Sequence, residues 1–159
     1  MRIVSLAERP DLTATLAQWH FAEWADLYPD WTLEACQAEL RSHTDADRLP
    51  TTLVAVDDAG EALGSVSLVL DDLPGWEHLS PWLASLFVRP DQRGRGVGSS
   101  LLRAAIADAR RLGVAALYLY TPFHEGYYAA RGWAEVARTS AGGRPVVIMT
   151  WQNCGYFKS

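Results

Sequence analysis

Cysteine is scarce in this chain of 159 residues, where only Cys36 and Cys154 occur. Neither thiol belongs to a C-x-x-C pair, and no histidine stands at a metal-ligand spacing from either of them. The sequence therefore suggests neither a disulfide framework nor a zinc site. We expect both thiols to be reduced bystanders, and we expect the protein to need no metal.

Long hydrophobic runs are also missing, since no apolar stretch approaches the roughly 20 residues that cross a bilayer. The first residues, MRIVSL, read as a strand with too little apolar length for a signal peptide. With 49% hydrophobic and 21% charged residues, the chain has the make-up of one compact domain with a substantial core. We expect one domain over residues 1–151, a C-terminal tail at 152–159, a cytoplasmic location and no membrane partner.

Positive charge is scarce in the first half of the chain. Residues 1–80 carry 15 of the 19 acidic groups and four arginines, whereas residues 81–159 carry ten basic and four acidic groups. The halves therefore bear net charges of −11 and +6. With a sequence pI near 5.3 and no basic stripe interleaved with aromatics, nucleic-acid binding is disfavoured. The acidic half is either a solvated face or a wall that attracts a cationic partner.

The most informative segment is Val88–Leu102, which reads VRPDQRGRGVGSSLL. It predicts a strand, a glycine-rich loop and the first turn of a helix. Missing Cβ atoms let an anion approach the main chain, and the first N–H groups of a helix lack internal partners and point at such a ligand. Arginines add positive charge around the same point. The residues concerned are Gly94, Gly96, Gly98, Arg89, Arg93 and Arg95.

Other glycine-rich phosphate loops fit this segment poorly. A Walker loop needs Gly-Lys-Ser/Thr, but Gly98 is followed by Ser99 and Ser100, so nucleotide hydrolysis has no support. The Rossmann pattern lacks its third glycine in either register, because Ser99 or Leu101 stands there. An ordinary glycine-rich turn remains the plain alternative.

Hydrophobic periodicity and turn residues predict alternating strands and helices in the order β-α-α-β-β-β-α-β-α-β-β. Asp11 and Thr32 are predicted to cap the first two helices. The predicted strands are Arg2–Leu6, Thr51–Asp57, Glu61–Leu70, Pro81–Val88, Val114–Tyr120, Trp133–Ser140 and Arg144–Trp151. The first predicted helix follows Asp11 and runs to about Trp24, and the second follows Thr32 and carries Leu33, Cys36 and Leu40. The third runs from the glycine loop to near Leu112, and a short fourth helix runs from about 125 to 131.

Read as Arg93-x-x-Gly96-x-Gly98, the loop resembles the acyl-CoA pyrophosphate loop of the GNAT superfamily of N-acetyltransferases, and the element order is similar to that of the superfamily. The resemblance implies an α/β fold with a central mixed, mostly antiparallel sheet of about seven strands. It implies that the sheet is splayed between the fourth and fifth strands and flanked by about four helices.

The same resemblance implies roles for particular residues. Tyr128, four residues before Gly132, matches a tyrosine that protonates the departing CoA thiolate, and a phenol with a pKa of about 10 is protonated at neutral pH. The main-chain N–H of Leu86 is implied to face the thioester carbonyl, as an oxyanion-type donor. Thr121 stands where many members carry asparagine. The residues implied to bind the acyl donor are Leu86, Phe87, Val88, Arg93, Gly94, Arg95, Gly96, Val97, Gly98, Ser99, Thr121 and Tyr128.

The activity implied by the resemblance is transfer of an acetyl group from acetyl-CoA to a primary amine by direct attack in a ternary complex. A non-catalytic acyl-CoA sensor or partner-recognition domain of the same fold is the alternative. The acceptor is a small-molecule or peptide amine, for which the acidic half favours a cationic one, and a homodimer is compatible with the family. The acyl chain length stays open.

The first two helices and the segment before the fourth strand are expected to border the acceptor. Aromatic faces beside carboxylates suit an ammonium group. The aromatic residues are Trp19, Phe21, Trp24, Tyr28 and Trp31, and the nearby acids are Glu23, Asp26 and Asp30. The group that takes the amine's proton stays open among Asp71, Asp72, Glu77, His78, His124 and water.

Overall fold

The computed structural model describes residues 1–153 of the chain. Seven strands form one mixed sheet in the order β1-β2-β3-β4-β5-β7-β6, with the predicted order of elements along the chain. The strands are β1 (Arg2–Ser5), β2 (Thr51–Val56), β3 (Ala62–Val69), β4 (Trp82–Val88), β5 (Ala116–Thr121), β6 (Ala134–Ala141) and β7 (Arg144–Gln152). The helices are α1 (Thr13–Trp24), α2 (Leu33–Arg41), α3 (Val97–Arg111) and α4 (Glu125–Ala129).

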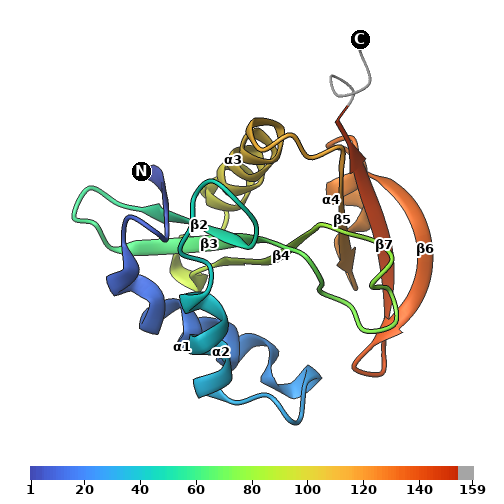
Figure 1. The fold of residues 1–159 in the computed structure, drawn as a ribbon, viewed down its shortest axis with the longest axis horizontal. Helices are drawn as coiled ribbons and strands as arrows, with labels where there is room; N and C mark the ends of the chain where they lie inside the picture. The colour runs from blue at the N-terminus through green and yellow to red at the C-terminus, as the bar shows by residue number, and fades with distance from the viewer. Residues whose placement is uncertain (154–159) are drawn as a thin grey trace.

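The sheet divides where β4 meets β5. This is the one parallel pairing among the named strands, and its register holds a single pair, Trp82 with Tyr118. Figure 1 shows β4 and β5 diverging from there, with β1–β4 on one side and β5–β7 on the other. The splay that the resemblance implied is therefore confirmed, as are the α/β class and the number of strands and α-helices.

Helices cover both faces of the first half of the sheet. α1 and α2 lie on one face and α3 lies on the other (Figure 1), and each layer has its own buried cluster. The apolar stripe of α3 contributes Val97, Leu101, Leu102, Ala105 and Ala109 to the larger cluster. A stripe of this kind buries one side of a helix against a sheet and leaves the other in water.

Of the two residues that were predicted to cap α1 and α2, one forms the predicted cap and the other does not. Thr32 caps α2 as predicted, because its Oγ1 accepts the N–H of Ala35 at 3.0 Å. The prediction that Asp11 caps the first helix is wrong. Asp11 lies in a short 3-10 turn before α1, and its carboxylate accepts two hydrogen bonds from Arg9. A cationic fork nearby is a stronger partner for a carboxylate than a backbone N–H.

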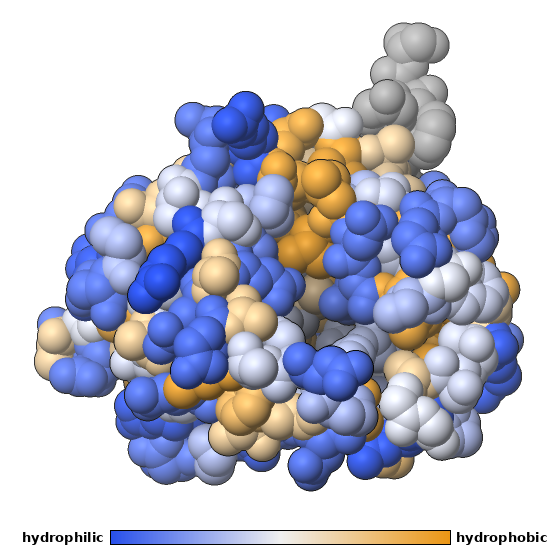
Figure 2. Space-filling view, turned by 60° about the horizontal axis from the view of Figure 1, so that its bottom comes forward, coloured by the Kyte–Doolittle hydropathy of each residue, from blue (hydrophilic) through white to orange (hydrophobic). Residues whose placement is uncertain are grey.

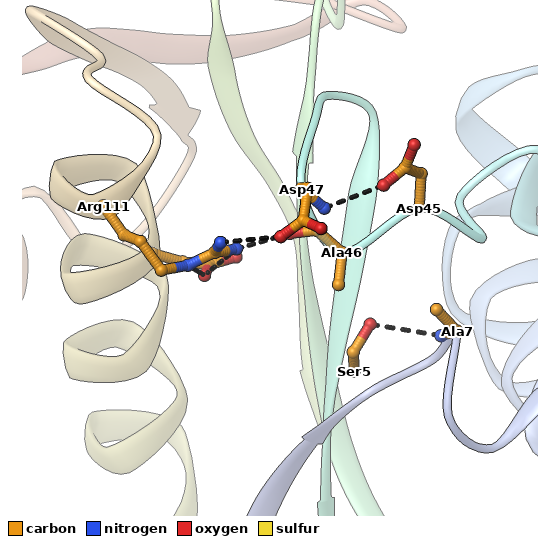
Figure 3. A network of polar contacts seen from close by, with 7 residues as sticks. Ser5, Ala7, Asp45, Ala46, Asp47 and Arg111 are labelled. Atoms are coloured by element: carbon orange, nitrogen blue, oxygen red, sulfur yellow. Dashed lines mark hydrogen bonds and ion pairs between the residues drawn. The ribbon is translucent and has the colours of Figure 1, made fainter.

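The last turn of α3 is tied to the segment that leads into β2. The guanidinium of Arg111 donates to Asp47 Oδ1 at 2.9 Å and to the carbonyl of Ala46, and it also pairs with Asp108 (Figure 3). A cation at a helix C-terminus also interacts favourably with the helix dipole. These contacts fix the end of α3 opposite the glycine loop.

The last strand extends one residue beyond its predicted end. β7 continues through Gln152, so the strand includes a residue that was assigned to the tail. Cys36 is buried, whereas Cys154 and the remainder of the predicted tail lie outside the described residues. Within residues 1–153, no helix has the length and apolar character to cross a membrane, and no acidic, histidine and cysteine side chains gather in a metal-binding group.

Candidate functional site

Strand β4 contains a bulge at the point where the sheet opens. Its register with β3 passes from Ala84, opposite Ser67, to Phe87, opposite Ser65, so Ser85 and Leu86 together oppose one residue. Ser85 has a φ of 55°, the one positive value at a non-glycine position among the described residues. Neither residue is registered with β5 either. A bulge of this kind re-aims main-chain groups and is frequent beside active sites.

The bulge opens into a cavity of about 1300 Å³ between the two halves of the sheet. Residues 83–88 of β4 and residues 119–123 at the end of β5 line its opposite walls. In Figure 2, where the lower side of Figure 1 comes forward, a hollow lies near the middle of the face with hydrophilic residues around it. Of the residues predicted to bind the acyl donor, Arg95 alone does not line this cavity.

The glycine loop forms one end of the cavity. Gly94 and Gly96 have φ values of 77° and 83°, and a Cβ added at either position would meet no atom within 4 Å. Gly96 is the N-cap of α3, so the N–H groups of Val97, Gly98 and Ser99 begin the helix without partners four residues back. The first turn contains no acidic residue. An anion is therefore favoured at this point by both the free N–H groups and the helix dipole.

The three arginines of the loop have different surroundings. Arg93 folds over the Phe87 ring at 5.6 Å and donates Nε–H to the carbonyl of Val88 at 2.9 Å. Arg89 does not line the cavity, because its guanidinium is held by Asp91 at 2.6 and 2.8 Å and by the carbonyl of Ala62. The expectation that all three arginines surround one anion is wrong for Arg89, whose charge is already compensated. Arg95 is exposed and stands outside the lining.

These features fit the diphosphate of an acyl-CoA. The first N–H groups of α3 and the side chain of Arg93 border the same open space. Side chains at positions 94 and 96, where the chain has glycine, would partly fill this space. We call Gly94, Gly96 and the first N–H groups of α3 the glycine cradle. The cavity continues from the glycine cradle along the bulged main chain of β4, which is the route that the extended pantetheine arm of an acyl-CoA would need in order to pair with a strand. When bound, acetyl-CoA would supply the activated acyl group.

Tyr128 enters the same cavity from α4. Its residue is 8% exposed, its ring packs edge-on against Trp133, and no described residue accepts or donates a hydrogen bond at its hydroxyl. Burial, and to a smaller extent the neighbouring Tyr127, raises the pKa of Tyr128 to about 12. The phenol is therefore protonated at neutral pH and is able to act as a proton donor.

The flanks of Tyr128 are fixed by hydrogen bonds. Tyr127 shares a hydrogen bond with Ser99 at 2.8 Å and lies beneath the guanidinium of Arg131. Thr121 is buried, and its hydroxyl accepts the N–H of His124 at 3.0 Å, at the start of α4. The hydroxyl of Thr121 thus positions the short helix that carries Tyr128.

The other end of the cavity is acidic. Seven carboxylates and two guanidinium groups occur in the lining, and all seven carboxylates come from the first half of the chain. Seven of the 15 acidic residues in the first half of the chain therefore line one cavity. The acidic residues are Glu23, Asp26, Asp30, Glu39, Asp71, Asp72 and Glu77.

The aromatic residues of the first two helices divide between the cavity and the core. Trp24, Tyr28 and Trp31 line the cavity. Trp19 packs on Phe87 with ring centroids 5.5 Å apart, and Phe21 packs on Trp31. Trp19 therefore packs α1 against β4 and does not line the cavity.

Four of the five side chains that were predicted as proton acceptors share this cavity, and one does not. Asp71, Asp72, Glu77 and His124 belong to its lining, whereas His78 stacks on Trp76 outside it. The Glu77 carboxylate already accepts the N–H of Gly75 at 3.0 Å, which lowers its pKa. Burial raises the pKa of Asp72 to about 7, with a further contribution from the charge of Glu39.

Sequence reasoning missed two buried histidines in the lining. His20 shares a hydrogen bond with Ser65 at 3.0 Å, and the Nδ1 atom of His43 lies 2.8 Å from the hydroxyl of Thr52. Burial lowers the pKa of both imidazoles to about 4, so they are neutral at pH 7. His20 stands four residues after Leu16, and that helical spacing is the signal that would have placed it on the buried face of α1.

Comparisons with known proteins agree with this geometry. The model of the acetyltransferase (GNAT) family matches residues 14–133. No curated protein matches the chain. Among solved structures, an aminoglycoside 6′-N-acetyltransferase complexed with coenzyme A superimposes with a TM-score of 0.71 at 17% identity, over 96% of this chain and 97% of that chain.

Two further solved structures have the same fold. A GCN5-related N-acetyltransferase from Kribbella flavida gives a TM-score of 0.70 at 22% identity, over 96% of this chain and 97% of that chain. A spermidine N-acetyltransferase SpeG chimera from Vibrio cholerae and hSSAT gives 0.67 at 16% identity, over 98% of both. At such identities the structures show the fold alone, and the family match rests on the sequence. This chain belongs to the GNAT acetyltransferase family.

Proposed function

We propose that the protein transfers the acetyl group of acetyl-CoA to a primary amine, by direct attack of the amine in a ternary complex. The observation that carries this proposal is the continuity of one cavity, which joins the glycine cradle, the bulge at Leu86, Tyr128 and the acidic wall. The solved relative that contains coenzyme A supports the choice of donor. The acidic wall supports a cationic acceptor.

The residues would act as follows. The N–H groups that begin α3, together with Arg93, hold the diphosphate, and the main chain of Leu86, Phe87 and Val88 pairs with the pantetheine arm. The N–H of Leu86 donates to the carbonyl oxygen, on which negative charge develops as the amine attacks. The C–N bond forms, the C–S bond breaks, and Tyr128 donates its phenolic proton to the departing thiolate. The proton that the attacking nitrogen then loses restores the phenol through water.

The amine must lose its proton before it attacks, because an alkylammonium with a pKa near 10.4 is neutral in only about one molecule in a few thousand at pH 7. Asp71, Asp72, Glu77 and His124 are the cavity side chains that would accept that proton, directly or through water. The structure supports these four above His78, which lies outside the cavity.

The test combines calorimetric titration with coenzyme A and measurement of thiol release from acetyl-CoA over a panel of amines. We expect saturable binding and amine-dependent thiol release. Binding without turnover on any amine would instead support an acyl-CoA sensor of the same fold. A titration with neither heat nor thermal protection would contradict the donor assignment altogether.

A further inference from the structure

Five side chains at the acidic end of the cavity form a cage, which we define as Tyr28, Trp31, Glu39, Asp72 and Tyr120. They come from four parts of the chain: the connection between α1 and α2, helix α2, the segment after β3, and β5. All five line the same cavity as the glycine cradle. The cage is therefore built by tertiary structure around space that is continuous with the acyl-transfer site.

The aromatic wall of the cage is held in place. The hydroxyls of Tyr28 and Tyr120 are joined by a short hydrogen bond that links the connection after α1 to β5. The ring of Trp31 stands edge-on to that of Tyr28, with centroids 5.9 Å apart. Aromatic faces fixed in this way attract a cation without losing much conformational freedom when it binds.

The two carboxylates of the cage have no cation of their own. No described residue forms an ion pair or a hydrogen bond with the carboxylate of Glu39 or of Asp72, and Ser42 donates only to the backbone carbonyl of Glu39. Asp72 is partly buried, whereas Glu39 is exposed at the rim, where neighbouring atoms still desolvate its carboxyl and raise its pKa. The charge of Glu39 also contributes to the raised pKa of Asp72, so the two groups act on each other. Such a pair destabilises the free protein and is relieved when a cation enters.

A buried imidazole beside the cage also lacks a full set of partners. His43 is 4% exposed and lines the cavity, and its Nδ1 is engaged by Thr52. No described residue forms a hydrogen bond with its Nε2 atom, and that atom is not fully buried. A neutral imidazole nitrogen is able to accept a hydrogen bond from an amine.

Two contacts connect distant segments of the chain at this end of the cavity. Besides the bond between Tyr28 and Tyr120, Leu27 approaches the turn between β6 and β7, where a Cβ added to Gly142 would lie 3.1 Å from its side chain and its carbonyl oxygen. The segment after α1 therefore touches both β5 and the β6–β7 turn. Space beneath such a bridge suits a slender molecule rather than a side chain on a folded protein.

We propose that the acceptor is a small flexible polyamine with at least two ammonium groups, and that its non-reacting ammonium group is held by the cage of Tyr28, Trp31, Glu39, Asp72 and Tyr120. This assignment rests on the proposed acetyl transfer, because it names the acceptor of that same site. The two carboxylates attract an alkylammonium by charge, and the three aromatic faces offer it a surface for cation–π contact. The second amino group, once neutral, reaches toward Leu86 and Tyr128.

The first experiment compares butylamine, 1,4-diaminobutane and spermidine as acceptors with acetyl-CoA. For the unmodified protein we expect kcat/KM for the diamine or triamine to exceed that for the monoamine by about 10- to 100-fold, the range of one charge-assisted contact. In the Glu39→Gln and Asp72→Asn variants, the ratio of kcat/KM for the polyamine to kcat/KM for butylamine should fall. In the double variant, which carries both substitutions, this ratio should approach one. The ratio is independent of any role of Asp72 in proton removal, because that role would affect all three amines.

The matched control is Glu34→Gln, on the exposed side of α2 and outside the cavity, which should keep the ratio of the unmodified protein. Equal kcat/KM values for monoamine and polyamine would overturn the cage, and so would a preference that survives the double variant. Circular dichroism and thermal melting establish that each variant is folded.

The second experiment separates this assignment from the proposed function. Spermidine is titrated calorimetrically into the protein, with and without coenzyme A, and then into the double variant. Spermidine binding that is lost in the double variant supports the cage, whether or not any amine is acetylated. If no amine is acetylated, the proposed acetyl transfer is contradicted while the cage is retained. Turnover of monoamines with no spermidine binding would leave acetyl transfer intact and overturn the cage.

Discussion

The rings of Tyr127 and Tyr128 lie at 90° to each other with centroids 5.2 Å apart, so two neighbouring tyrosines on α4 serve different surroundings. Tyr127 directs its hydroxyl to Ser99, at the start of α3. Both rings line the cavity, but the hydroxyl of Tyr128 forms no hydrogen bond with a described residue. A helix turns by about 100° for each residue, and this rotation separates a packing tyrosine from a candidate acid.

This difference predicts the outcome of two phenylalanine substitutions. Tyr128→Phe should lower kcat by about 100-fold or more, because general-acid catalysis typically contributes 10²–10⁴. Its dissociation constant for acetyl-CoA should stay within about two-fold, since the ring is retained and only the proton donor is lost. Stopped-flow turnover and calorimetry would measure both quantities.

The neighbouring substitution is the control. Tyr127→Phe should cost about 1 kcal/mol of unfolding free energy by removing the hydrogen bond to Ser99. Any kinetic effect should fall on acetyl-CoA affinity rather than on kcat, because Ser99 belongs to the cradle. Unchanged turnover in Tyr128→Phe would remove that residue from the mechanism.

The glycine cradle is tested by a pair of alanine substitutions with equal backbone strain. Gly96 at the start of α3 and Gly113 beyond its end have φ values of 83° and 74°, and neither has an atom near an added Cβ. Each Gly→Ala change should cost about 1–2 kcal/mol of stability. Gly96→Ala alone should weaken coenzyme A binding, by about ten-fold or more, because its methyl group enters the space of the diphosphate. Equal affinities in the two variants would place the anion elsewhere.

The bulge in β4 predicts an unusual response to substitution at Ser85. Glycine there should relieve about 1–2 kcal/mol of left-handed strain. About 0.5–1 kcal/mol of that gain is lost to the greater freedom of the unfolded chain. Urea unfolding should therefore show a net gain of up to about 1 kcal/mol, with turnover retained if only the main chain acts.

Ser85→Val provides the opposite case. A β-branched side chain resists a positive φ, so stability should fall by about 1–3 kcal/mol and turnover should fall with it as the bulge flattens. A valine variant with full stability and full activity would show that the bulge does not position the reacting carbonyl.

Asp72 predicts a pH dependence of stability. Its pKa rises from 3.8 to about 7 on folding, so between pH 4 and 7 the folded chain keeps a proton that the unfolded chain has lost. The contribution of this group to stability therefore falls as pH rises through that window. In Asp72→Asn the penalty is absent, and the variant should exceed the unmodified protein by about 1–2 kcal/mol at pH 8 and by little at pH 4, with the effect limited by cavity water.

The measurement is urea unfolding at several pH values, with Asp71→Asn as the control at the exposed neighbouring position. That control should change stability by less than about 0.5 kcal/mol throughout. A gain for Asp72→Asn that is the same at pH 4 and pH 8 would show that it does not arise from ionisation. Asp72→Asn would then gain stability while it loses the carboxylate that we propose binds an ammonium group. Such an exchange of stability for function is common at binding sites.

Local signals in the sequence were enough for much of the architecture. The alternation in Glu61–Leu70, the capping threonine Thr32 and the glycine loop each act within a few residues, so strands, helices and a cradle for an anion are predictable from neighbours along the chain. Asp11 shows the limit even at this range, because the carboxylate found a better partner in Arg9 than in the start of α1.

Tertiary structure decided where charge and hydroxyl groups meet. The guanidinium of Arg89 is hydrogen-bonded to Asp91 and to the carbonyl of Ala62 on β3, and Arg89 does not line the cavity. The bulge at Ser85 depends on how β4 pairs with β3, and the cage joins Glu39, Asp72 and Tyr120 from separate elements. Spacing along the chain carries the periodicity of helices and strands, but contacts between distant segments depend on the packing free energy of the whole fold. For that reason the sequence by itself determined the elements and the glycine loop, and only the folded structure determined which carboxylates line the cavity.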